Sequence, residues 1–216
     1  MGFKQVKRKI RRPFEVGACL FLFTLVRFLP FKGVRFLARV FGAILYLIPS
    51  QRKLAIANLD TAFPDKTSVE KKKIARRSMA NLVMTFMEQI WFNGHEKRQA
   101  KYLSFSPEIQ QQLSSLEQDN RPVLFLALHM GNWEFTSLSL KRYSDRRLCV
   151  VANKVKNAWL NDWIIKAREF TGVKVLLGEG AVKGLLKALR NKENVGLLVD
   201  QNTKTRNGGI FGDFFG

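Results

Sequence analysis

Short apolar runs and longer amphipathic stretches alternate through the second half of the chain. Four apolar runs have the length and composition of buried parallel strands, at residues 123–128, 148–152, 173–177 and 195–199. Helical periodicity separates the later runs, over 157–170 and 181–191. Strand, helix and strand in succession at these lengths predict an α/β fold with a largely parallel central sheet flanked by helices.

The N-terminal segment combines a basic cluster with an apolar run. The run from Val16 to Val26 is 11 residues long and ends at Arg27. It is therefore shorter than the roughly 20 apolar residues that a membrane-spanning helix needs. We interpret it as a marginal span or a deeply placed interfacial helix, with its basic flanks on the cytoplasmic side. The basic cluster consists of Lys4, Lys7, Arg8, Lys9, Arg11 and Arg12.

Residues 31–48 are predicted to form an amphipathic helix. Apolar residues recur at helical spacing from Val34 to Ile48, and Lys32, Arg35 and Arg39 are expected on the opposite face. This pattern is typical of a helix lying in a membrane surface. The alternative is an ordinary amphipathic helix that packs on the domain. The preceding apolar run favours the membrane, so residues 1–50 are predicted to be membrane-anchoring helices.

Further helices are predicted before the first strand. Residues 51–60 have helical character, and Thr67 with Glu70 forms a capping-box pattern at the start of the next helix. Ser106-Pro107 is typical of the beginning of a short polar helix that ends near Asp119.

His129 stands where the first predicted strand ends, and the turn residues Gly131 and Asn132 follow it. The carboxyl ends of parallel strands are the edge at which α/β sheets place their chemistry. An imidazole can take a proton from a hydroxyl near neutral pH, and a carboxylate on its other nitrogen fixes the tautomer. A turn could bring Glu134 back onto the ring, which makes His129 a candidate general base and Glu134 its orienting acid. The alternative is a structural histidine.

The segment HMGNWE (129–134) resembles the H-x4-D/E motif of glycerolipid-type acyltransferases, and GNWE brings it nearest to the bacterial lipid A late acyltransferases. Other segments agree in the right order. They are RKLAIANLDTAFPD (52–65), Glu88, Asn157 with Arg168 and Gly172, Asp200-Gln201, and GGIFGDFFG (208–216).

This resemblance implies an O-acyltransferase that moves a fatty acyl chain from an acyl carrier protein or coenzyme A thioester to a hydroxyl of a lipid A-type glycolipid precursor. It implies His129 and Glu134 as catalytic residues, and the implied reaction needs no cofactor or metal. Its implied location is the bacterial inner membrane, with the active site on the cytoplasmic side. The candidate substrate-binding residues are Gly131, Asn132, Lys154, Asn157, Arg168 and Asp200.

Two features depart from the family pattern. Where the family commonly has V-Y-R, the chain has Val151-Ala152-Asn153-Lys154. An arginine for substrate phosphate is thus replaced or displaced, and Lys154 offers a point charge without the bidentate fork. The chain also stops at Gly216, where family members usually continue. Residues 51–216 are therefore predicted to be an acyltransferase α/β domain that lacks its C-terminal part.

Charge and composition restrict the classes of binding partner that suit this chain. The net charge is +20, and the segment from Met1 to Asp60 contributes +10, from twelve Lys and Arg against Glu15 and Asp60. An anionic membrane surface, a nucleic acid or an acidic carrier protein would suit this charge. The 18 phenylalanines favour lipid over nucleic acid. The rival hypothesis is a non-catalytic basic protein that binds membranes or nucleic acid, and a third is an acyltransferase acting on a lysophospholipid.

Overall fold

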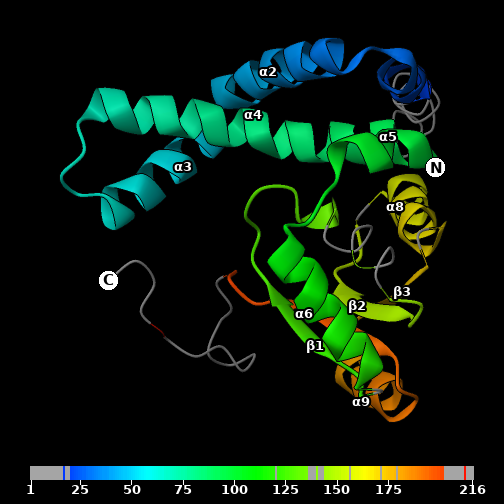
Figure 1. Cartoon of the computed structure of the whole chain (residues 1–216). Helices are drawn as coiled ribbons and strands as arrows, with labels where there is room; N and C mark the ends of the chain where they lie inside the picture. Colours follow the sequence, from blue (N-terminus) through cyan, green and yellow to red (C-terminus); the bar gives the residue numbers. More distant parts are fainter. Residues whose placement is uncertain are drawn as a thin grey trace, which may run out of the picture. The chain divides into compact units, whose positions relative to one another are not determined.

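A computed structural model of the chain (Figure 1) describes residues 17, 20–119, 121–135, 140, 144–155, 157–170, 172–178, 180–201 and 212. The basic cluster of residues 4–12 and the motif at 208–216, apart from Gly212, lie outside these described residues. The chain divides into two compact units, Met1–Asn93 and Gly94–Gly216.

The first unit is helical. Residues 20–28 form a helix, and it is followed by α2 (Phe31–Leu47), α3 (Pro49–Ala62) and α4 (Ser68–Phe92). The predicted capping box begins α4, because the Thr67 side chain accepts from the Glu70 backbone N–H and the Glu70 carboxylate accepts from the Thr67 backbone. Because α3 and α4 pack with α2, the functional boundary predicted at residue 50 lies inside this unit and stays a prediction.

Helix α2 has two apolar faces with different environments. Its buried residues Val34, Ala38, Gly42 and Tyr46 recur every fourth position, and Gly42 allows close packing on α4, because a Cβ there would lie 2.5 Å from the Ala80 Cα. At about 100° per residue, a second set of apolar side chains falls on the opposite face. These side chains are exposed: Phe36, Val40, Ile44 and Leu47. Helix packing and membrane contact, the two sequence-based alternatives, thus concern different faces of α2.

None of the helices in the described part of the chain has both the length and the apolar composition needed to cross a bilayer. Membrane association of the N-terminal helices therefore remains a proposal.

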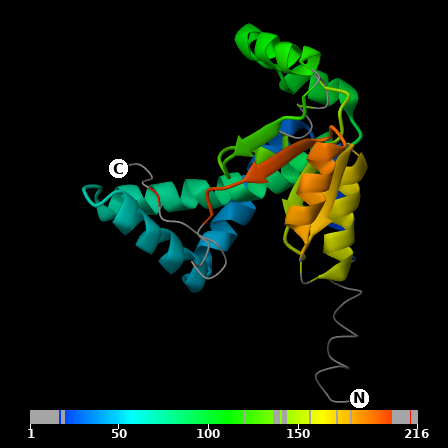
Figure 2. The same cartoon turned by 90° about the horizontal axis from the view of Figure 1, so that it is seen from below.

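The second unit is an α/β unit, as predicted. It contains α5 (Glu96–Tyr102), α6 (Pro107–Gln118), β1 (Leu124–Ala127), β2 (Leu148–Ala152), α8 (Ala158–Phe170), β3 (Val173–Leu177), α9 (Ala181–Arg190) and β4 (Asn194–Leu198). The four strands form one parallel sheet in the order β1-β4-β2-β3 (Figure 2), in which the orange-red β4 lies beside the green β1.

Each face of this sheet has a small core. On one face, Cys149 and Val195 pack with Ala188 of α9. On the other, Leu148 and Val173 pack with Leu140, and Leu113 of α6 covers part of the cluster. Burial raises the pKa of the Cys149 thiol, which agrees with a packing role for this residue.

Candidate active site

The pairing of β1 with β4 aligns two polar residues beyond the ends of the strands. Leu124 lies opposite Val195 and Ala127 opposite Leu198, in one constant register. Parallel strands keep their register where they leave the sheet. Continued by two positions beyond Ala127 and Leu198, the same register places His129 opposite Asp200. The ladder therefore brings these two residues together at its carboxyl edge.

The two side chains form a close pair. The Nδ1 atom of His129 lies 2.8 Å from Oδ1 of Asp200, and the backbone N–H of His129 donates to Oδ2 at 2.8 Å. Both carboxylate oxygens thus bind one residue, which fixes the plane of the carboxylate and the orientation of the ring. The imidazole side chain is 24% exposed and the Asp200 side chain 16%, so part of the ring is open to solvent.

Opposing effects determine the pKa of the Asp200 carboxyl group. Desolvation raises its pKa, but hydrogen bonds from the His129 ring and backbone outweigh this, and the net pKa lies below the ordinary value. Asp200 is therefore ionised at every pH at which an imidazole can act as a base. An ionised carboxylate beside Nδ1 favours the tautomer with the proton on Nδ1, which leaves the lone pair on Nε2.

The turn after His129 positions the next residues. Gly131 has a φ of 62°, a left-handed conformation that suits glycine, and residues 133–135 begin a helical turn. The Trp133 ring lies edge-on to the imidazole, with ring centroids 5.0 Å apart. Trp133 was not predicted from the sequence as a site residue, although its position four residues after the histidine was a usable signal.

Glu134 is placed differently from the prediction. Its carboxylate, 6% exposed, accepts from Arg168 Nε at 3.0 Å and from Nη2 at 2.5 Å. This is the bidentate geometry of a strong charge-assisted pair. The expected contact of Glu134 with the His129 ring is replaced by Asp200 at Nδ1. Arg168, one of the predicted substrate-binding residues, directs its fork at Glu134.

Comparison with known proteins decides the family. A family model described as bacterial lipid A biosynthesis acyltransferase matches residues 3–216. The chain belongs to this family. The lipid A biosynthesis palmitoleoyltransferase of Escherichia coli K12 and the lipid A biosynthesis acyltransferase of Shigella flexneri are each 25% identical to it over 193 residues. These matches cover 87% of this chain and 60% of each relative.

The remaining predicted site residues lie after β2. Lys154 is exposed two residues beyond the strand and makes no ion pair with the residues that the structure describes. Asn157 precedes α8, and its side-chain oxygen accepts from the Leu160 backbone N–H at 3.1 Å, which is an N-cap contact. The family's asparagine therefore has a structural use here, and a role in substrate binding remains a proposal.

The Arg168–Glu134 pair of the α/β unit predicts an asymmetric loss of stability. Arg168→Gln should lower the free energy of unfolding by about 3–5 kcal/mol, because it leaves the buried carboxylate without its guanidinium. Glu134→Gln should cost less, about 1–3 kcal/mol, because the Arg168 side chain is 20% exposed and can be hydrated. Urea unfolding of the two variants tests this, with Arg121→Gln in an exposed pair as a control that should change little. A larger loss for Glu134→Gln would contradict the burial argument.

Proposed function

We propose that this chain carries the catalytic site of an O-acyltransferase that moves a fatty acyl group from a thioester to a hydroxyl of a lipid A-type glycolipid precursor. The observation that supports this most is the pair of His129 and Asp200 at the carboxyl edge of a parallel sheet. A histidine oriented by an ionised acid can remove a proton from a substrate hydroxyl. Membership of the lipid A biosynthesis acyltransferase family supports a lipid A-type acceptor.

The proposed reaction needs no nucleophile from the protein. Nε2 of His129 takes the proton of the acceptor hydroxyl as its oxygen attacks the acyl carbonyl carbon. The C–O ester bond forms and the C–S bond of the donor breaks. The imidazolium then returns its proton to the leaving thiolate. Asp200 stabilises the imidazolium between these two transfers, as the acid does in hydrolytic triads.

The other site residues are assigned supporting roles. The Glu134–Arg168 pair holds the segment that follows the histidine, because each partner comes from a different part of the unit. Gly131 and Asn132 shape the turn beside the imidazole. Lys154 lies beyond the end of β2 and makes no ion pair in the part of the chain that the structure describes, so it is our candidate for a substrate phosphate.

We also propose that the protein works at the cytoplasmic surface of the inner membrane. The first unit exposes large apolar side chains along consecutive helices, among them Phe21 at 70%, Phe28 at 78% and Phe36 at 65%. Exposed apolar surface of this extent is typical of a membrane or protein contact. The net charge of +20 suits an anionic leaflet and an acidic acyl donor carrier.

An assay of the purified chain in detergent or vesicles tests the proposed function. The acyl donor is offered either on acyl carrier protein or on coenzyme A, and the acceptor is either a lipid A precursor or a lysophospholipid. We expect the lipid A precursor to gain the mass of one acyl chain. Transfer to the lysophospholipid alone would overturn the acceptor, and absence of transfer to both acceptors with both donors would overturn an enzymatic role for this chain.

A further inference from the structure

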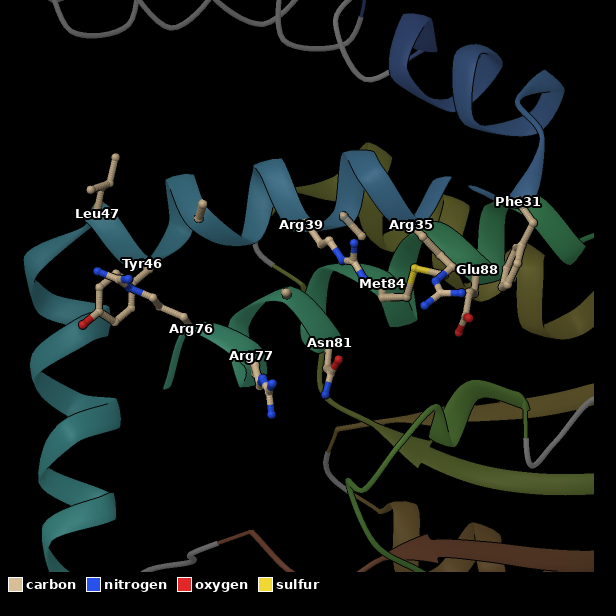
Figure 3. Close-up of a pocket in the computed structure, with 13 residues that line it drawn as sticks. Phe31, Arg35, Arg39, Tyr46, Leu47, Arg76, Arg77, Asn81, Met84 and Glu88 are labelled. Atoms are coloured by element: carbon tan, nitrogen blue, oxygen red, sulfur yellow. The ribbon is translucent and has the colours of Figure 1, made fainter. Parts of the chain in front are cut away.

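A groove of about 880 Å³ runs between α2 and α4 in the first unit (Figure 3). The helices are antiparallel, because Phe31 at the start of α2 contacts Trp91 near the end of α4, with ring centroids 5.0 Å apart. Tyr46, near the other end of α2, packs on Met79. From Phe31 to Leu47 the helix rises about 24 Å at 1.5 Å per residue, a length that suits an extended acyl chain.

Four arginines surround this groove. Arg35 and Arg39 extend from α2, and Arg76 and Arg77 from α4. The lining also contains one acidic residue, Glu88, so its formal charge is +3 (four minus one). Arg76 lies over the Tyr46 ring, 4.9 Å from its centroid. Arg35, Arg39 and Arg77 form no ion pair with any residue that the structure describes, which leaves three guanidinium groups available to an anion.

Between the arginines the groove is apolar. Its lining includes the small side chains of Ala38, Ala43 and Ala80 together with Met84. Leu47, 70% exposed, both lines the groove and belongs to the exposed apolar face of α2. The cationic rim therefore borders an apolar helix face. A soluble acidic protein would find matching charge here but no partner for that face, whereas an anionic lipid at a membrane surface matches both.

We propose that the α2–α4 groove binds an anionic phospholipid, with one acyl chain along the apolar lining and the phosphate on Arg35, Arg39 and Arg77. Guanidinium groups are suited to phosphate because they donate in a planar fork. The residues that line the groove all belong to the helical unit, and the lipid proposed here is assigned to that unit and not to the role of acyl acceptor at His129. The groove would hold the first unit to anionic regions of the membrane.

Vesicle flotation with a charge-matched control tests the cationic rim. The triple variant Arg35→Gln, Arg39→Gln, Arg77→Gln is compared with a control that also loses three charges, at exposed positions outside the groove: Lys53→Gln, Lys72→Gln and Lys73→Gln. A basic residue near an anionic surface contributes roughly fivefold in affinity. We expect the groove variant to bind phosphatidylglycerol vesicles at least tenfold more weakly than the control. An equal loss in both variants would overturn the proposal in favour of general charge attraction.

A photoactivatable phosphatidylglycerol, labelled in its acyl chain, tests the apolar lining. We expect crosslinks in α2 and α4, and we expect Ala43→Phe, which fills the groove, to reduce them several-fold. Ala57→Phe on an exposed part of α3 serves as the matched control and should leave them unchanged. Crosslinks confined to residues 20–29 or to Gly94–Gly216 would contradict the proposal.

Two further outcomes distinguish a lipid-binding groove from a protein-docking site and from the site of acyl transfer. If the triple arginine variant loses binding of an acidic acyl carrier protein while vesicle binding is unchanged, the groove is a protein-docking site and the lipid proposal fails. His129→Ala should bind phosphatidylglycerol vesicles as the unchanged chain does. Loss of vesicle binding in that variant would contradict a separate lipid site, whereas failure of the acyl-transfer assay alone would leave the groove result standing.

Discussion

Replacement of His129 by alanine should reduce acyl transfer by about 10²–10⁴-fold, the range that a positioned general base contributes. This corresponds to about 3–5.5 kcal/mol in the activation free energy. The imidazole is the group that we assign to remove the acceptor proton, so substrate binding should persist and the loss should appear in kcat. The measurement is the initial rate of label transfer from the thioester donor at saturating acceptor.

The chain's other histidine, His95, provides the control for this variant. His95 is the N-cap residue of α5 and does not follow a strand, and His95→Ala should retain the rate of the unchanged protein. An unchanged rate in His129→Ala would contradict the proposed base. A rate lost equally in both variants would show that loss of a histidine acts through the fold.

Asp200→Asn should lower kcat by a similar factor of about 10²–10⁴, although the substitution keeps the size of the side chain. The carboxylate accepts two hydrogen bonds from His129, at Oδ1 from the ring and at Oδ2 from the backbone N–H. An amide has one acceptor oxygen, and the backbone N–H can only donate. The amide NH₂ group would therefore face Nδ1 and force the proton onto Nε2, which is the wrong tautomer for a base.

A control at another aspartate of the α/β unit separates this tautomer effect from the general loss of a negative charge. Asp145→Asn removes an exposed carboxylate beside β2 and should leave kcat unchanged. Thermal unfolding of Asp200→Asn checks that the fold persists. Full activity in a folded Asp200→Asn protein would show that the imidazole works without this partner.

The strands were predictable because buried parallel strands are dense apolar runs. β2 and β3 have the predicted bounds, and β1 and β4 differ from them by one residue at each end. The short helix α5 (Glu96–Tyr102) was missed, since the sequence EKRQAKY has no apolar periodicity to mark it.

The partner of His129 could not be read from spacing. Glu134 is near in sequence, but its buried carboxylate contacts Arg168, 34 residues away. The strand predicted at 195–199 ends just before Asp200, and the structure places Asp200 at the carboxyl end of β4, but its contact with the ring depends on strand order. Sequential strands usually neighbour each other, which would place β2 beside β1. Here β4 occupies that position, and only this order brings Asp200 to Nδ1.

Asp200 contacts Nδ1 of His129, whereas the Glu134 carboxylate accepts from Arg168. Proton and nitrogen NMR of the chain with labelled histidine rings tests it directly, because the sequence contains two histidines and His95→Gln assigns both. We predict a hydrogen-bonded Nδ1 proton for His129 that disappears in Asp200→Asn and persists in folded Glu134→Gln. A signal that survives Asp200→Asn and is lost in Glu134→Gln would contradict the account.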